Sequence, residues 1–161
     1  MEKIHIICID DQRNVLNALV SDLQLLESHY SIEECESATE AWDLIDEIYD
    51  KGNFVGLIIT DHVMPENTGV DFLKKLKMDG RFESTKKVLL TGQATHQDTI
   101  EAINSTGLNH YIEKPWDKEK LLHIVKSLLT TFLVEVGLEY KEYLEVIDSD
   151  TLYQLLKNTT G

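Results

Sequence analysis

The chain of 161 residues contains only two cysteines and two prolines, and it has no long hydrophobic run. Cys8 and Cys35 lie in apolar or strand-like surroundings without metal-ligand spacing, which favours buried free thiols of a reducing cytosol, although a disulfide stays open. The apolar run that begins at Ile4 is too short and too early for a signal peptide, and no other run approaches membrane-spanning length. We therefore expect a cytoplasmic protein without membrane contact.

Basic side chains are also scarce. The chain has 15 lysines and arginines and 29 aspartates and glutamates, which give it a formal net charge of −14 at pH 7. Nucleic acid and anionic lipid repel such a chain, and no concentrated basic stripe interrupts it, which argues against direct binding of nucleic acid. The length is sufficient for one domain with a full core and a small appendage, rather than for two compact domains.

Five short apolar segments with the character of buried strands alternate with five amphipathic helical patterns. The expected strands are residues 4–9, 31–35, 57–60, 86–90 and 110–113. The helical patterns lie within residues 15–26, 38–48, 70–76, 100–103 and 121–132. Ser37 or Thr39 suits the start of the second helix, and Gly107 suits a left-handed cap after the fourth. This alternation predicts an α/β protein built from βαβ units, with helices on both faces of a parallel sheet.

The pattern changes beyond about residue 130. Residues 131–147 carry apolar side chains at helical spacing interrupted by Gly137, and a last short helix is expected around residues 152–156. We therefore divide the chain into a domain of residues 1–130 and a helical extension or linker of residues 131–161. The extension is a lid on the domain's own surface, a dimer contact or the start of a linker, since its apolar residues need cover.

Polar and charged side chains follow the expected strands at the points where these strands end. Asp10 and Asp11 follow the first strand, Asp61 ends the third, Thr91 closes the fourth and Lys114 follows the fifth. The carboxyl ends of parallel strands meet at one edge of the sheet, where loops form a crevice for ligands. We therefore expect these five side chains to lie close together.

Three crowded carboxylates repel one another strongly at low effective dielectric, which implies a bound cation. Oxygen ligands suit Mg²⁺, which accepts few protein ligands and keeps its waters for a phosphate, with Mn²⁺ as an alternative. A lysine supplies a mobile positive charge for a phosphoryl oxygen, and a threonine supplies a hydroxyl donor. Together these groups predict a site for phosphoryl transfer to a carboxylate. His62, next to Asp61, is expected to be a solvated loop side chain rather than a general base.

Four short motifs occur in order, each at the end of an expected strand. They are Asp10-Asp11, Asp61 followed by Met64-Pro65 and Gly69, Thr91-Gly92, and Lys114-Pro115. Over residues 3 to about 130 the chain resembles a response-regulator receiver domain of two-component signalling. The resemblance implies a flavodoxin-like sheet of strand order 2-1-3-4-5 and a cis peptide bond between Lys114 and Pro115.

The resemblance also assigns the metal and phosphoryl ligands. Asp61 would be the phosphoacceptor and a metal ligand. Asp11 would bind Mg²⁺ directly, Asp10 through water and Val63 through its backbone carbonyl. Lys114 would bind the phosphoryl group.

The remaining implied roles concern switching and the lifetime of the phosphorylated state. Thr91 would also bind the phosphoryl group and would form a switch pair with Tyr111, while Val63 and Gln93 would tune hydrolysis. Phosphorylation adds nearly two negative charges, so it would shift the population between two packings of the fourth helix, fifth strand and fifth helix. Trp116 stands where the family often has phenylalanine, and the tryptophan variant resembles receivers attached to cyclic-nucleotide signalling or phosphatase outputs.

The expected function is a switch that accepts a phosphoryl group from a histidine kinase or histidine phosphotransferase and acts on a downstream protein or fused effector. It would catalyse only its own phosphorylation and dephosphorylation, and the extension would support a homodimer. A Mg²⁺-dependent phosphatase with an aspartyl-phosphate intermediate is an alternative, although such enzymes usually place an acid where this chain has Val63. A constitutive interaction module with the same fold is a further alternative.

Overall fold

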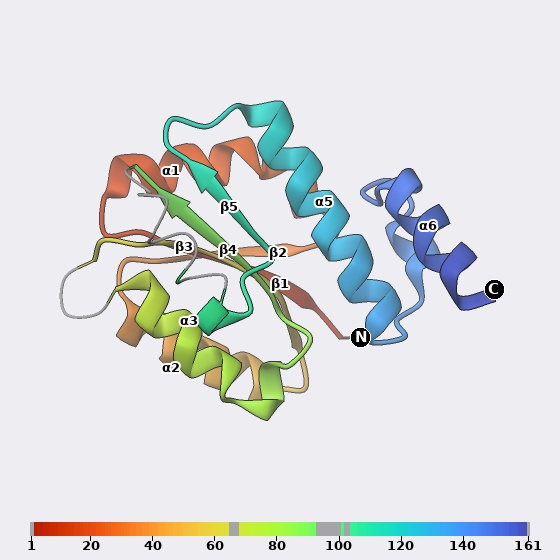
Figure 1. Cartoon of the computed structure of the whole chain (residues 1–161), viewed down its shortest axis with the longest axis horizontal. Coiled ribbons are helices and arrows are strands. Elements are labelled where there is room, and N and C mark those ends of the chain that lie inside the picture. The colour runs from red at the N-terminus through yellow and green to blue at the C-terminus, as the bar shows by residue number, and fades with distance from the viewer. Residues whose placement is uncertain (1, 65–67, 93–100, 102–103, 161) are drawn as a thin grey trace.

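A computed structural model describes residues 2–64, 68–92, 101 and 104–160 of the chain. Five parallel strands form one sheet with the spatial order β2-β1-β3-β4-β5 (Figure 1). The strands are β1 (Ile4–Ile9), β2 (Ser31–Cys35), β3 (Phe54–Asp61), β4 (Lys86–Thr91) and β5 (His110–Glu113). The fold class and the strand order expected from the sequence are therefore confirmed.

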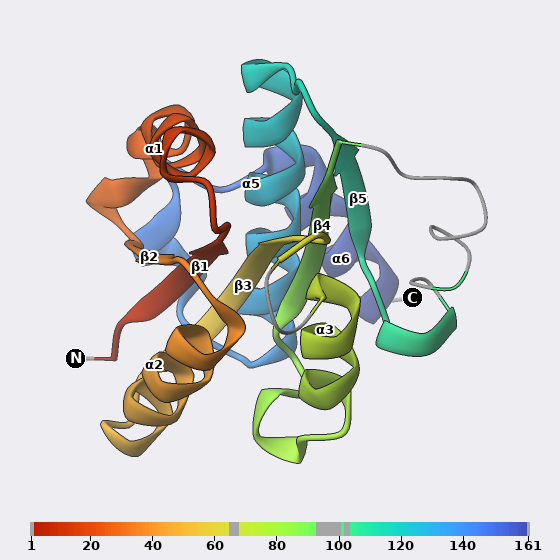
Figure 2. The same cartoon turned by 90° about the vertical axis from the view of Figure 1, so that its left-hand side faces the viewer.

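Helices cover both faces of this sheet. They are α1 (Arg13–Asp22), α2 (Ala38–Asp50), α3 (Gly69–Lys77), α5 (Lys118–Glu135) and α6 (Ser149–Thr160), with short 3₁₀ turns η1 (Gln24–Ser28), η2 (Gly80–Phe82) and η3 (Tyr140–Tyr143). α1 and α5 lie on one side of the sheet, and α2 and α3 lie on the other (Figure 2). Of the helix expected around residues 100–103, only residue 101 is described; residues 104–106 are helical, and Gly107 has the expected positive φ of 69°.

None of the helices in these described stretches combines the length and apolar character needed to cross a bilayer.

The apolar strands are explained by burial on both faces of the sheet. Along β1, Ile6 and Cys8 join the core beneath α1 and α5, whereas Ile7 and Ile9 join the core beneath α2 and α3. Cys35 also lies in the second core, so the two cysteines are on opposite faces and are free thiols, as expected. Burial raises the pKa of both thiols, which keeps them protonated and unreactive.

Several elements differ from their expected bounds by a few residues, and packing explains two of these differences. β3 begins at Phe54, three residues earlier than the sequence indicates, and it includes Gly56, whose missing side chain leaves room for Ile4 and Leu129. The single helix expected over residues 15–26 ends at Asp22 and continues as η1. At Leu23 the backbone N–H lies 3.1 Å and 3.2 Å from two successive carbonyls, which tightens the helix into a 3₁₀ turn.

The extension packs on the domain itself. Gly137, with φ of 73°, follows the end of α5 and turns the chain back, so that the ring of Tyr143 stacks on Tyr30 at 5.4 Å between centroids. α6 lies against α5 (Figure 1), where the hydroxyls of Ser127 and Thr151 are hydrogen-bonded at 2.8 Å. Of the three arrangements expected for residues 131–161, the structure shows the lid on the domain's own surface, and a dimer contact stays a prediction.

Replacing Ile147 by alanine should destabilise the protein by about 2–4 kcal/mol, because this side chain is only 7% exposed and belongs to the core beneath α5. Leu144→Ala is the matched control: Leu144 is 59% exposed, and its loss should change the unfolding free energy by less than about 0.5 kcal/mol. Urea denaturation of both variants measures the difference. Equal small effects would show that the extension is not part of the cooperative fold.

Candidate functional site

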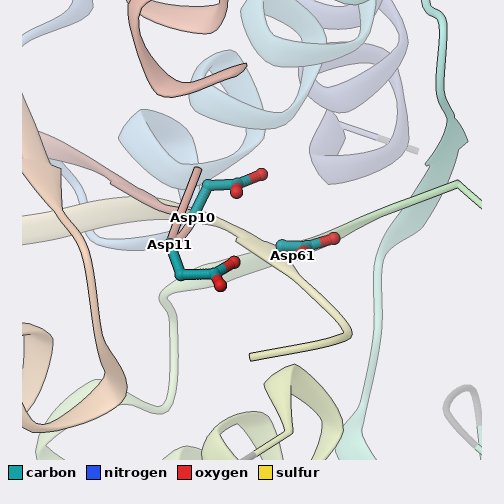
Figure 3. A group of neighbouring side chains, drawn as sticks. All are labelled: Asp10, Asp11 and Asp61. Atoms are coloured by element: carbon teal, nitrogen blue, oxygen red, sulfur yellow. The ribbon is translucent and has the colours of Figure 1, made fainter. Parts of the chain in front are cut away.

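Two neighbouring strands bring three carboxylates to the same edge of the sheet. Ile9, the last residue of β1, pairs with Thr60 of β3, so that Asp10 and Asp61 follow at the same level. Figure 3 shows the side chains of Asp10, Asp11 and Asp61 gathered around one space. One oxygen of each carboxylate lies within 4.8 Å of the others.

These carboxylates fit a hard divalent cation. Oxygen ligands of one Mg²⁺ lie about 2.0–2.1 Å from it, and thus at most about 4.2 Å from one another. The observed spacing of up to 4.8 Å needs only a small side-chain adjustment, or one intervening water, to meet that limit. Asp10 is fully buried and held in place, because its Oδ1 accepts a hydrogen bond from the backbone N–H of Gln12 at 2.9 Å.

One ammonium group offsets part of the crowded negative charge. The Nζ of Lys114 lies 3.0 Å from Asp10 Oδ2 and 3.0 Å from Asp61 Oδ1. The backbone N–H of Lys114 donates to the carbonyl of Thr91 at 2.8 Å, and the peptide bond to Pro115 is cis, as expected. Burial acts to lower the pKa of Lys114, but its hydrogen bonds and ion pairs with the two aspartates outweigh burial and raise it.

The environment of Asp61 opposes its ionisation. Burial raises the pKa of this carboxyl; Lys114 counteracts that rise, and the negative charge of Asp10 adds to it. A cation bound between the carboxylates would favour the ionised form. Without a counterion the site therefore disfavours the ionised form of Asp61, and with a bound cation it favours that form.

The loop after β3 is held tightly against the backbone of Asp61. Thr60 Oγ1 donates to the Asp61 carbonyl at 3.0 Å, and the N–H of Gly69 donates to the His62 carbonyl at 2.9 Å. A Cβ on Gly69 would collide with the Asp61 carbonyl, so only glycine permits this close approach. His62 is half-buried, with its Nδ1 shielded from solvent, and is therefore not the solvated side chain expected from the sequence.

The other expected site residues occupy the same end of the sheet, with different exposure. Thr91 is buried at the end of β4, and Tyr111, on the neighbouring edge strand β5, is 38% exposed. The side chain of Val63 is largely exposed in the loop after Asp61. Gln93, expected to tune hydrolysis, lies outside the described residues, as does Pro65 of the loop motif.

The sequence analysis missed one contact that supports the site. The indole N–H of Trp116 donates to Asp22 Oδ2 at 2.8 Å and so ties the segment that carries Lys114 to α1. Asp22 lies 94 positions away, and no local pattern indicates this pair. Its only signal in the sequence is the presence of tryptophan directly after Lys114-Pro115.

Chemically, the arrangement suits the binding of a divalent cation next to an acceptor carboxylate. The ammonium of Lys114 has a third N–H donor beyond its contacts with Asp10 and Asp61, and this donor can bind another anionic group such as a phosphoryl oxygen. No general acid–base pair is needed for phosphoryl transfer to a carboxylate, since positioning and charge neutralisation dominate that reaction.

Comparison with known proteins agrees with this site. A family model described as the response regulator receiver domain matches residues 6–126. Response regulator Rre1 of Synechocystis sp. is 33% identical over 128 residues, which are 80% of this chain and 52% of Rre1. A chemotaxis protein CheY homologue of Campylobacter jejuni is 29% identical over 126 residues, 78% of this chain and 92% of the homologue. The chain belongs to the response regulator receiver domain family.

A solved structure shows the same likeness. The signal receiver domain of an HD domain-containing protein from Pseudomonas fluorescens superposes with a TM-score of 0.71 and 27% identity, covering 85% of this chain and 94% of that domain. Receiver domains of two-component systems are signalling domains rather than classical enzymes. The chain spans about half the length of Rre1.

Gly69→Ala should destabilise the protein by about 1–3 kcal/mol, because the added methyl forces the backbone of Asp61 to move. The same displacement should weaken Mg²⁺ binding, as measured by calorimetric titration. Gly80→Ala is the matched control, since nothing lies within 4 Å of a Cβ at that position, and both quantities should be unchanged. A Gly69→Ala protein with normal stability and normal Mg²⁺ affinity would contradict the close approach.

Without divalent cations, Asp61→Asn should stabilise the protein at neutral pH. The pKa of Asp61 is higher in the folded protein than in the unfolded chain, so its ionisation costs folding free energy. That cost is absent below the unfolded pKa and grows as the pH rises through the folded pKa. The gain from Asp61→Asn should thus be larger at about pH 8 than at about pH 4.

Urea unfolding in EDTA at both pH values tests this, with Asp43→Asn, an exposed residue in the middle of α2, as the matched control. A stability difference that does not change with pH would contradict the expected cost of ionising Asp61.

Proposed function

We propose that this receiver accepts a phosphoryl group on Asp61 from a histidine kinase or histidine phosphotransferase in a Mg²⁺-dependent reaction. The observation that carries the proposal is the convergence of three carboxylates and one ammonium group at the end of β1 and β3. Membership of the receiver family supports it.

In the proposed reaction, an Asp61 carboxylate oxygen attacks the phosphorus of a phosphohistidine and forms an acyl phosphate. The phosphorus–nitrogen bond breaks, and the imidazole nitrogen leaves with the electron pair and takes up a proton. Lys114, now shared between Asp10 and Asp61, turns toward a phosphoryl oxygen. Mg²⁺, held by Asp61, by Asp11 directly, by Asp10 through water and by the Val63 carbonyl, would neutralise the charge of the transferring group.

The phosphorylated state then differs from the free state through Thr91 and Tyr111. The Thr91 hydroxyl turns toward the added phosphoryl group and donates a hydrogen bond to one of its oxygens, and the partly exposed ring of Tyr111 moves inward on the neighbouring strand. This change shifts the population toward a packing that a downstream protein or fused effector recognises. Val63 and Gln93 tune the rate at which the acyl phosphate is hydrolysed.

The setting of the protein follows from the same proposal. We infer a cytoplasmic location, where histidine kinases present their phosphohistidine, and a receiver of residues 1–130 with the helical extension of residues 131–161. Catalysis is limited to the protein's own phosphorylation and dephosphorylation. A homodimer is a further expectation.

Incubation with Mg²⁺ and a small phosphodonor should add the mass of one phosphoryl group to the protein, as measured by intact mass spectrometry. Asp61→Asn should abolish the addition, and Asp11→Asn should slow it by weakening Mg²⁺ binding. Asp50→Asn, an exposed carboxylate on α2, is the control and should behave as wild type.

Three results would contradict the proposal. Full phosphorylation of Asp61→Asn would place the acceptor elsewhere. Turnover of phosphate esters by the purified protein would favour the phosphatase alternative. Failure to bind Mg²⁺ or to gain any mass would favour the constitutive interaction module.

A further inference from the structure

The segment that connects β5 to α5 carries Lys114. The backbone N–H of Lys114 donates to the Thr91 carbonyl at 2.8 Å, which fixes the start of the segment against the end of β4. Residues 114–117 belong to no helix or strand, and Asp117, the N-cap residue of α5, makes no side-chain capping hydrogen bond. The position of Lys114 therefore depends on how the second half of this segment is held.

Trp116 holds that second half against α1. Its indole N–H donates to Asp22 Oδ2 at 2.8 Å, and its partly buried ring packs against the apolar core beneath α1 and α5. These two helices contact each other on that face of the sheet (Figure 1). An indole has a single hydrogen-bond donor, so the bond to Asp22 uses the whole hydrogen-bonding capacity of the Trp116 side chain.

The location of Asp22 is not explained by its own helix. Asp22 is the last residue of α1, where the partial negative charge of a helix C-terminus disfavours a carboxylate. The last turn of α1 contains no basic residue, and Asp22 forms no ion pair with any residue that the structure describes. The indole N–H of Trp116 thus supplies a stabilising donor to this carboxylate, and a hydrogen bond to a charged acceptor is stronger than one between neutral groups.

The contact lies close enough along the chain to control Lys114. Trp116 is two positions after Lys114, so a displacement of Trp116 would move the backbone of Lys114 as well. The Nζ of Lys114 lies 3.0 Å from Asp10 Oδ2 and 3.0 Å from Asp61 Oδ1. A shift of about 1 Å would take these two hydrogen bonds outside their normal range.

We infer that Asp22 and Trp116 are positioning residues, whose hydrogen bond holds Lys114 where it contacts the acceptor carboxylate and, during phosphoryl transfer, a phosphoryl oxygen. The effect on phosphoryl transfer rests on the proposed function, whereas the effect on Lys114 does not. Neither residue touches the reacting atoms. A group that is already in place does not have to be ordered during the reaction, which lowers the barrier.

The first test measures Lys114 without any phosphodonor. NMR of the lysine side chains of the full chain in EDTA, recorded over a pH series, gives the pKa of Lys114. Trp116→Phe removes the N–H and keeps an aromatic ring, and Asp22→Ala removes the acceptor. Both should lower the pKa of Lys114, because a displaced ammonium loses contact with Asp10 and Asp61. Asp22→Asn keeps an acceptor oxygen without the charge and should preserve most of the wild-type value.

The second test measures the rate at which a small phosphodonor and Mg²⁺ add a phosphoryl group, by intact mass spectrometry. Loss of the hydrogen bond should slow the addition by roughly tenfold in Trp116→Phe and in Asp22→Ala. The double variant should be no slower than either single variant, because both remove the same bond. Asp22→Asn should restore most of the rate.

Trp42→Phe is the matched control. Trp42 lies on α2, where its ring contacts Phe72 in the core on the other face of the sheet. This variant also replaces an indole by a phenyl ring, but it should change neither the pKa of Lys114 nor the rate.

Two results would overturn the inference: a pKa of Lys114 that Trp116→Phe and Asp22→Ala leave unchanged, or effects of the two substitutions that simply add in the double variant. If the wild-type protein gains no phosphoryl group, the proposed function fails, and the pKa of Lys114 in EDTA still decides whether Asp22 and Trp116 position this residue.

Discussion

The pairing of one ammonium group with two buried carboxylates is the interaction on which the functional edge of this protein depends. Asp10 and Asp61 would repel each other at the ends of adjacent strands, and Lys114 offsets that repulsion with contacts of 3.0 Å to each. The compensation is partial, because the pKa of Asp61 is still raised. Such a site would be stabilised by an additional cation and by an anionic group that takes over Lys114, as the proposed phosphoryl transfer requires.

The parallel sheet makes this pairing possible. Its central strands β1 and β3 are buried on both faces and are largely apolar, and the carboxylates of the site stand at their ends. Two residues outside the carboxylate cluster support the site. Gly69 permits close contact with the Asp61 carbonyl, and Trp116 anchors the segment that carries Lys114 to α1. The extension adds a further layer on the outer side of α5 without contributing a residue to the carboxylate cluster.

The effect of a charged side chain in this protein depends on its immediate surroundings rather than on the net charge of the chain. The net charge of −14 argues against a general affinity for anions, yet it says nothing about the environment of any single lysine. Lys86 and Lys87 are adjacent in sequence and point to opposite faces of β4; Lys86 pairs with Glu135, whereas Lys87 has no carboxylate partner among the described residues. The alternation of a strand thus places two identical side chains in different environments.

The sequence by itself determined the alternation of strands and helices and the positions of Asp10, Asp61 and Lys114 at strand ends, because hydrophobic periodicity and strand termini are local properties. The tertiary structure decided which distant residues meet: Trp116 with Asp22, and the extension with α5. It also decided the end of α1 at Asp22 and the partial burial of His62. These features depend on packing between segments far apart along the chain, which no local pattern of residues encodes.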